Sequence, residues 1–192
     1  MTVNTFPPII LASKSPRRQE LLTLMDITFS VILREVDETY PPGLPVEEVA
    51  SHIAEKKALA FDHQLNGELV ITADTVVVLD DQILGKPAGP EDAMTMLRSL
   101  SGRTHRVITG VCLLYQDKLV KFSDVTEVVL RELTGDEIRY YVEKYQPLDK
   151  AGSYGIQEWI GLTAIESIRG SYTNVVGLPT EKLYKNLLAV TA

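Results

Sequence analysis

Apolar and polar positions follow two spacings along the chain, one typical of strands and one typical of helices. An apolar run at residues 9–12 ends in a polar turn, and apolar residues then recur at helical spacing between residues 17 and 25. This pattern predicts a strand, a tight turn and a helix. Ser15 suits the N-cap of that helix and Pro16 its first turn, because proline lacks the N–H that a first turn leaves unpaired. The N-terminus of the helix therefore faces the end of a strand.

The densest run of β-branched residues, 69–79, predicts a strand that is buried on both faces. The other expected strands are 28–33, 82–84, 104–115, 118–131 and 162–168, and the other expected helices are 46–65, 90–100, 134–144 and 174–190. Strands and helices alternate early, but a hairpin stands in the middle of the chain. The sequence therefore favours an α/β fold with a mixed central sheet flanked by helices. We expect one domain over residues 1–192, because a chain of this length can bury a full core.

The charge balance limits the partners that the protein can have. The chain has 26 acidic and 19 basic residues, with a net charge of -7, and its cations are not gathered in one stretch. Nucleic acid would meet net repulsion, so we expect no stable nucleic-acid partner. No apolar run approaches the ~18 residues that span a bilayer, and the N-terminus has no export signal. We therefore expect a cytoplasmic protein without a membrane partner.

The single cysteine, Cys112, lies in an apolar run and has no second cysteine to pair with. Such a residue packs as a small hydrophobe, which fits a reducing compartment. The three histidines have no spacing typical of zinc ligands, so a zinc site is not expected. Ser13 and Ser15 have no evident histidine partner, and no Gly-x-Ser-x-Gly segment exists, so covalent serine catalysis is unsupported.

Cations crowd the first strand-to-helix turn. Lys14, Arg17 and Arg18 lie there, while Lys56, Lys57 and Lys86 lie near the ends of other elements. The free N–H groups and the positive dipole end of a helix, joined by two guanidinium groups, form a cradle for phosphate. A solvated basic face is the alternative. Neither common glycine-rich nucleotide loop is present.

Asp74 interrupts the most apolar strand of the chain. A carboxylate in this position is costly to bury unless it meets a cation or a metal ion. Asp37 and Glu38 follow a separate strand, and acidic groups from different strands form the oxygen-rich arrangement that Mg²⁺ prefers. The alternatives are a structural ion pair for Asp74 and a solvated surface position for Glu38.

Eight segments, in order from about residue 9 to 188, resemble the Maf family of nucleoside triphosphate pyrophosphatases. They are Leu11-Ala-Ser-Lys-Ser-Pro-Arg-Arg-Gln-Glu-Leu-Leu22, Ala54-Glu-Lys-Lys-Ala58, Thr72-Ala-Asp-Thr-Val-Val77, Gly85-Lys-Pro87, Leu100-Ser-Gly102, Lys150-Ala-Gly-Ser-Tyr-Gly-Ile-Gln157, Gly170-Ser-Tyr172 and Val176-Gly-Leu-Pro179. Chance agreement of all eight is implausible. The resemblance implies two lobes around a mixed sheet with the site in a cleft between them, as in the related inosine triphosphate pyrophosphatases. It also implies homodimers, which many members form.

The resemblance also implies roles for individual residues. Asp74 is similar to the family's proton acceptor, and Glu38 and Asp74 match its acidic positions for a divalent cation, Mg²⁺ or Mn²⁺. The residues implied to bind the triphosphate are Ser13, Arg18, Lys57 and Lys86. The expected reaction is metal-assisted attack of water on the α-phosphorus, which releases the nucleoside monophosphate and pyrophosphate.

Three positions divide the family by base preference. The branch that acts on dTTP and UTP has Arg, Thr and Gln, which match Arg17, Thr75 and Gln157. The branch of 7-methyl-GTP pyrophosphatases has Trp, Gln and Glu instead. A glutamine amide offers both a donor and an acceptor, which suits the N–H and carbonyl groups of uracil and thymine. The resemblance to the first branch therefore implies dTTP and UTP as substrates.

Alternatives from other classes stay open at this point. One is a regulator of cell division that binds nucleoside triphosphates without hydrolysing them, since members of the family are associated with arrest of septation. The acidic positions Glu38 and Asp74 favour an enzyme, because binding a polyanion alone would gain more from cations there. A 7-methyl-GTP pyrophosphatase and a nucleotidyltransferase are further alternatives, although no sugar-acceptor motif supports the latter.

Overall fold

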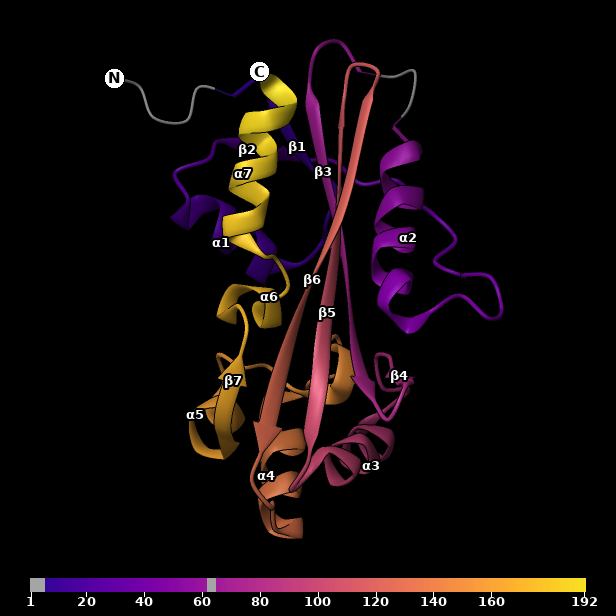
Figure 1. The fold of residues 1–192 in the computed structure, drawn as a ribbon. Helices are drawn as coiled ribbons and strands as arrows, with labels where there is room; N and C mark the ends of the chain where they lie inside the picture. The colour runs from indigo at the N-terminus through magenta and orange to yellow at the C-terminus, as the bar shows by residue number, and fades with distance from the viewer. Residues whose placement is uncertain (1–5, 62–64) are drawn as a thin grey trace. The chain divides into compact units, whose positions relative to one another are not determined.

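A mixed sheet forms the centre of the fold in the computed structural model, which describes residues 6–61 and 65–192 (Figure 1). Its strands are β1 (Ile9–Leu11), β2 (Phe29–Val31), β3 (Leu69–Leu79), β4 (Gln82–Leu84), β5 (Thr104–Tyr115), β6 (Lys118–Leu130) and β7 (Ile165–Arg169). They lie in the order β2-β1-β3-β5-β6-β7, and β4 pairs with β3. β1 is parallel to β2 and β3, whereas β4 and β7 are antiparallel to their neighbours. The prediction of a mixed sheet is confirmed.

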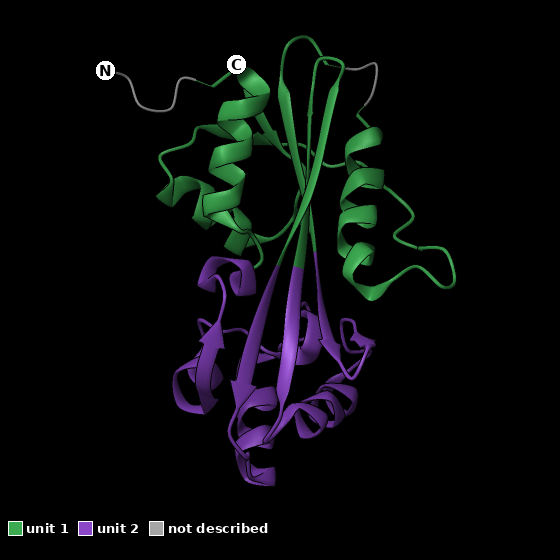
Figure 2. Ribbon diagram, in the orientation of Figure 1, with its two compact units in different colours: residues 1–74, 109–124, 177–192 green, residues 75–108, 125–176 purple. Residues whose placement is uncertain are grey.

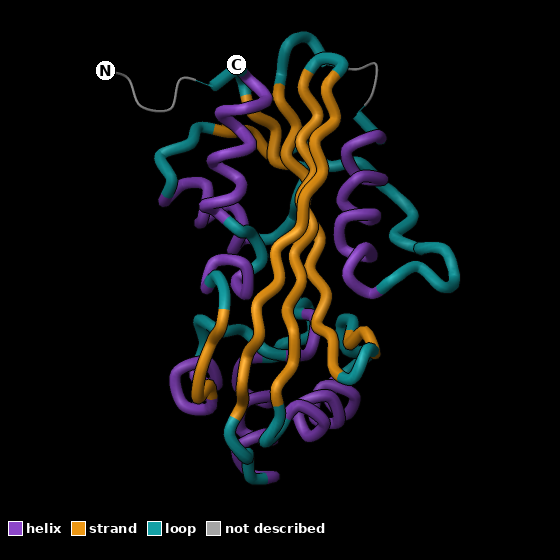
Figure 3. The backbone as a smooth tube through the Cα atoms, in the orientation of Figure 1, coloured by secondary structure: helices purple, strands orange, loops and turns teal. Residues whose placement is uncertain are grey.

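Helices flank the strands, as predicted (Figure 3). They are α1 (Pro16–Leu24), α2 (Val46–Leu59), α3 (Pro90–Leu100), α4 (Gly135–Tyr145), α5 (Trp159–Ala164), α6 (Tyr172–Val176) and α7 (Thr180–Thr191), with a 3-10 turn η1 (Ala151–Ser153). The predicted N-cap of α1 is confirmed, since the Ser15 side chain accepts from the Arg18 N–H. Within the described ranges, no helix is long and apolar enough to cross a membrane.

The chain divides into two compact units (Figure 2). The first comprises residues 1–74, 109–124 and 177–192, and the second comprises residues 75–108 and 125–176. β3, β5 and β6 contribute residues to both units. Two units agree with the two lobes that the resemblance implies, while the cleft and the single domain over residues 1–192 stay predictions.

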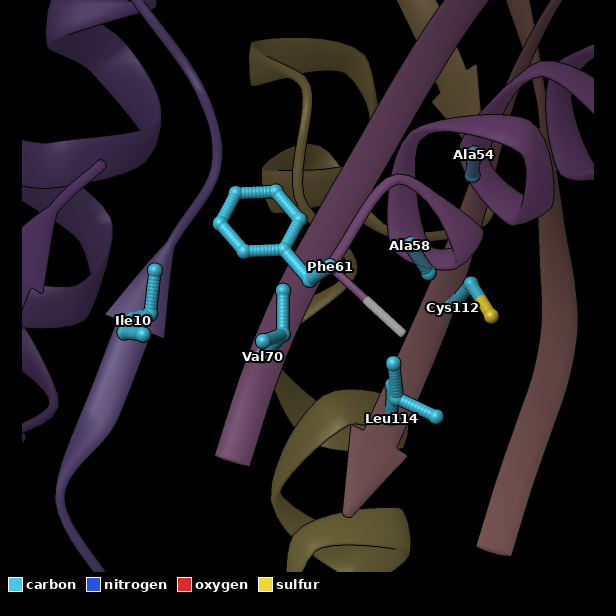
Figure 4. Packing of buried hydrophobic residues seen from close by; sticks show 7 residues of the cluster. All are labelled: Ile10, Ala54, Ala58, Phe61, Val70, Cys112 and Leu114. Carbon is cyan, nitrogen blue, oxygen red and sulfur yellow. The ribbon is translucent and has the colours of Figure 1, made fainter. Parts of the chain in front are cut away.

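One buried apolar cluster of the first unit lies between α2 and the strands. Figure 4 shows side chains of α2 packed against side chains of β1, β3 and β5. The cluster comprises Ile10, Ala54, Ala58, Phe61, Val70, Cys112 and Leu114. α1 and α7 lie on the other side of the strands from α2 (Figure 1). Cys112 is fully buried, and burial raises the pKa of its thiol to about 12. The prediction that it packs as a small hydrophobe is confirmed.

The predicted strand at 162–168 is wrong in its first half. Residues 159–164 form α5, and the strand β7 begins only at Ile165, which pairs with Leu130. The Leu162 N–H donates to the Glu158 carbonyl at 3.2 Å and continues a helical turn. A short apolar run does not distinguish a strand from a helix, so the local bonding decides the outcome.

Two predicted helices differ in extent. The predicted terminal helix at 174–190 is two helices, α6 and α7, because Pro179 disfavours helical backbone at the residue before it and suits the start of a new helix. The predicted helix at 46–65 ends at Leu59. Residues 62–64, including His63, lie outside the described residues.

Candidate active site

The placement of Lys57 follows from one buried hydrogen bond between β3 and α2. The Thr72 hydroxyl donates to the Ala54 carbonyl at 2.6 Å. Thr72 and Asp74 point to the same face of β3, and Ala54 and Lys57 lie one turn apart on the same face of α2. The bond therefore brings Lys57 beside Asp74, and the ammonium Nζ lies 2.8 Å from Asp74 Oδ1. Each of these two side chains is 16% exposed.

A close backbone contact brings α2 near β5. A Cβ atom added to Gly110 of β5 would lie 2.1 Å from the Ser51 nitrogen of α2. Real Cβ atoms essentially never approach a heavy atom so closely, so only glycine fits here. The distance between α2 and the strands depends on this contact, and with it the position of Lys57.

Glu38 reaches the same ammonium group from the loop between β2 and α2. Its Oε1 lies 3.0 Å from Lys57 Nζ, and its side chain is 53% exposed. The adjacent Lys56 donates to the Thr39 carbonyl at 2.9 Å and lies 3.6 Å from Asp37 Oδ2. The Thr39 hydroxyl and N–H donate to Asp37 and hold the pKa of that carboxyl below its usual value. Glu38 and Asp74 thus share one cation, the Lys57 ammonium.

Arg18 is bound to the backbone on either side of its guanidinium group. Its Nε donates to the Gly177 carbonyl at 2.8 Å, and its Nη1 donates to the Ala73 carbonyl at 2.8 Å. Nη1 also donates to the buried Ser13 hydroxyl at 3.2 Å. Burial lowers the pKa of Arg18, and the nearby Asp74 carboxylate opposes that shift. Arg18 is therefore a preorganised cation beside Asp74, and it joins three of the segments that carry the family resemblance.

The two carboxylates fit a divalent cation. Asp74 and Glu38 both contact the Lys57 ammonium, so they already converge on one positive charge. Across residues 6–61 and 65–192, no group of three or more His, Cys, Asp or Glu side chains is arranged to hold a metal ion. Mg²⁺ and Mn²⁺ suit such a site, because Mg²⁺ commonly takes one or two carboxylates and completes its shell with water and substrate phosphate.

The remaining predicted site residues lie in α1 and in the second unit. Arg17 is half-buried in the first turn of α1, in the first unit. Thr75 is half-buried directly after Asp74, and Lys86 is exposed after β4. Gln157 is exposed in a turn that the Glu158 N–H closes by donating to the Gly155 carbonyl at 3.0 Å. The first unit thus brings together Ser13, Arg18, Glu38, Lys57 and Asp74, while Thr75, Lys86 and Gln157 belong to the second.

Several contributing residues were not predicted from the sequence. Thr72 positions α2, and the carbonyl groups of Ala73 and Gly177 hold Arg18. A hydroxyl two residues before a carboxylate in an apolar strand is a signal that could have marked Thr72. A backbone carbonyl has no sequence signal, because every residue carries one.

The site combines cations at a strand-to-helix turn with two converging carboxylates, one in a strand and one in a loop, an arrangement typical of proteins that bind phosphate groups together with a divalent metal. The chain belongs to the Maf family, since the family described as "Maf-like protein" matches residues 8–190. The resemblance in the eight segments is thereby confirmed.

Relatives of known name cover nearly the whole chain. A Bacteroides fragilis protein named "dTTP/UTP pyrophosphatase" is 54% identical over 181 residues, covering 93% of this chain and 94% of its own. A Flavobacterium psychrophilum protein of the same name is 51% identical over 181 residues, covering 94% and 93%. The Staphylococcus aureus Ham1 protein superimposes with a TM-score of 0.56 at 16% identity, covering 95% of this chain and 99% of that one. The last likeness concerns the fold alone.

Proposed function

We propose that this protein is a nucleoside triphosphate pyrophosphatase that hydrolyses dTTP and UTP to the monophosphate and pyrophosphate. The observation that carries the proposal is the convergence of Asp74, Glu38 and Lys57 beside the anchored guanidinium group of Arg18. Membership of the Maf family supports it, and so do relatives named "dTTP/UTP pyrophosphatase" that match over more than nine tenths of the chain.

The cations act on the triphosphate. Hydrolysis of a phosphoanhydride depends mainly on positioning and on neutralising charge at the transferring group. The charges of Arg18 and Lys57 are already held beside Asp74, where they can neutralise phosphate. The Ser13 hydroxyl accepts a hydrogen bond from Arg18 Nη1 and helps to hold the guanidinium group. Lys86 supplies a further exposed cation to the phosphates. These four residues form the proposed phosphate-binding set.

Asp74 accepts the proton of the attacking water. The water oxygen forms a bond to the α-phosphorus while the bond to the bridging oxygen breaks, and pyrophosphate leaves with the electron pair of that bond. The partial burial of Asp74 in β3 keeps the carboxylate in one place, as a general base requires. Glu38 and Asp74 would hold a divalent metal ion, Mg²⁺ or Mn²⁺, which when bound neutralises phosphate charge and makes water more acidic.

Arg17, Thr75 and Gln157 select the base. The Gln157 amide offers a donor and an acceptor to the pyrimidine edge, and Arg17 donates to a carbonyl oxygen. The cytoplasmic location and the homodimer expected from the sequence belong to the same proposal, with nucleoside triphosphates as the small-molecule partners.

A panel of nucleotides tests the proposal directly. Pyrophosphate release, coupled to inorganic pyrophosphatase, is measured for dTTP, UTP, CTP, GTP and 7-methyl-GTP with Mg²⁺ or Mn²⁺ and again with excess chelator. We expect fastest turnover of dTTP and UTP and loss of activity without metal. Fastest turnover of 7-methyl-GTP would contradict the base assignment. Tight binding of dTTP without pyrophosphate release would favour the regulator.

A further inference from the structure

Gln157 is presented at the centre of a tight turn. The Glu158 N–H donates to the Gly155 carbonyl at 3.0 Å, which places Ile156 and Gln157 at the two central positions. Ile156 is buried and Gln157 is exposed. The direction of the Gln157 amide therefore depends on what holds the two ends of this turn.

One buried phenol holds both ends. The Tyr141 hydroxyl, on α4, accepts from the Gly155 N–H at 2.9 Å and donates to Glu158 Oε2. Tyr141 is fully buried, and burial together with the neighbouring Glu158 carboxylate raises the pKa of its hydroxyl. The group stays a neutral phenol and keeps its proton as a donor. A single side-chain atom thus joins the first and last residues of the turn.

A buried ammonium group holds the other oxygen of the same carboxylate. Lys150 Nζ lies 3.0 Å from Glu158 Oε1 and 2.8 Å from Asp149 Oδ1, and its side chain is 10% exposed. Both Glu158 oxygens therefore have a partner, which restricts rotation of the carboxylate. A largely buried ion pair of this kind adds little stability, because desolvation of both charges offsets their attraction. Its value here lies in fixing geometry.

The rest of the loop is packed against its neighbours in the same unit. A Cβ atom added to Gly152 would lie 2.9 Å from Val77 Cγ2 of β3, and the Gly152 N–H donates to the Gly85 carbonyl at 3.1 Å. The Tyr154 hydroxyl lies 2.7 Å from Nε2 of the buried His105. The loop therefore has little freedom to shift as a whole, so the turn at residues 155–158 rests on a rigid base.

We infer that Tyr141 and Lys150 are positioning residues for base selection, acting through Glu158 to aim the Gln157 amide at the pyrimidine edge. The inference rests on the proposed function. Tyr141 bonds the Gly155 N–H and the Glu158 carboxylate, which stand at the two ends of the turn, so loss of these bonds frees the backbone that carries the Gln157 amide. An amide that is misdirected loses its matched donor and acceptor, which are what distinguish a uracil or thymine ring from a cytosine ring.

The test is Tyr141→Phe, measured as the ratio of kcat/KM for dTTP to kcat/KM for CTP. We expect that ratio to fall about tenfold, because hydrogen-bond loss at both ends of the turn misplaces the amide while leaving the charges that bind phosphate. In a Gln157→Ala background, Tyr141→Phe is expected to change the ratio no further, since coupled residues are not additive. Tyr140→Phe, at an exposed position on the same helix, is the matched control and should keep the wild-type ratio.

Glu158→Gln provides a second variant, because it keeps the shape of the side chain and removes the charge that Lys150 pairs with. It is expected to lower the same ratio, with circular dichroism unchanged. Equal loss of turnover on both nucleotides, or a Tyr141→Phe effect that adds in full to Gln157→Ala, would show a purely structural role and overturn the inference. If the wild-type protein prefers dTTP to CTP and Tyr141→Phe leaves the dTTP-to-CTP ratio unchanged, only the inference is overturned. A wild-type protein that hydrolyses neither nucleotide overturns the proposed function as well.

Discussion

The two units hold their polar side chains in contrasting ways. In the first, Arg18, Lys57 and Asp74 stay partly exposed and are steered by contacts with the backbone of neighbouring elements. In the second, Tyr141, Glu158 and Lys150 form a largely buried network beneath one exposed glutamine. Groups that neutralise a substrate's charge must reach it, whereas groups that select a base work through a rigid support. The contrast leads us to expect that changes at Asp74 act mainly on rate and that changes in the Tyr141 network act mainly on selectivity.

The largest effect is expected from Asp74→Asn, which removes the proposed proton acceptor and keeps the size of the side chain. We expect kcat to fall by about 10²–10⁴-fold, the usual contribution of a general base. The base preference that remains should be unchanged, because Arg17, Thr75 and Gln157 are untouched. Pyrophosphate release from dTTP measures both quantities.

Asp136→Asn is the matched control, since Asp136 is an exposed residue of α4 whose carboxylate pairs with Arg139. This control should keep wild-type kcat. A correctly folded Asp74→Asn protein with native turnover would disprove the role of Asp74. A changed base preference would show that Asp74 also affects selectivity.

A smaller effect is expected from Gly110→Ala, which adds the Cβ atom that would lie 2.1 Å from the Ser51 nitrogen. The backbone of α2 must move away from β5, and overpacking of this kind costs about 1–3 kcal/mol or more. Thermal unfolding measures the loss of stability, and kcat should fall with it because α2 carries Lys57. Gly135→Ala is the control, since nothing lies within 4 Å of its added Cβ. Equal stability of the two variants would contradict the close contact.

The smallest effect concerns His105, a buried ring of the second unit that contacts the Tyr154 hydroxyl. Burial lowers the pKa of His105 from 6.5 to about 4, so the folded protein holds this ring neutral. As pH falls below 6.5 the unfolded chain binds a proton that folded His105 does not bind until about pH 4. Stability is therefore lost across this window, by up to roughly 3 kcal/mol from this group.

His105→Gln removes the titrating ring and should reduce the fall in thermal midpoint between pH 8 and pH 4.5. Each protein's own midpoint at pH 8 serves as its reference. If both proteins lose the same number of degrees, the folded ring binds its proton at the same pH as in the unfolded chain, which would contradict a neutral buried His105.

Sequence patterns predicted the extent of some elements well and of others poorly, for identifiable reasons. The bounds of β3 and β4 agree with the predicted 69–79 and 82–84, because β-branched residues are bounded there by turn residues. The predicted helix at 134–144 likewise agrees with α4, whose first turn is closed by a capping box between Thr134 and Glu137. α5 was missed because its few apolar residues have no periodicity of their own, and a bond to the Glu158 carbonyl decides their conformation.

The site shows a similar limit. The polarity of Asp74 within an apolar strand marked it as a candidate. Spacing alone did not show whether Lys56 or Lys57 would meet it, because that depends on how Thr72 bonds to α2. Only the family resemblance selected Lys57. The network of Tyr141 had no signal at all, since a tyrosine in an apolar helix face is predicted to be an ordinary core residue.

Cys112 has a practical consequence for experiments on this molecule. The Cys112 side chain is buried in the core of the first unit. The raised pKa of its thiol keeps the sulfur in the unreactive protonated form at neutral pH. The chain has no other cysteine. A thiol introduced at any exposed position would therefore be the sole target for alkylating dyes or spin labels, without first removing a native one.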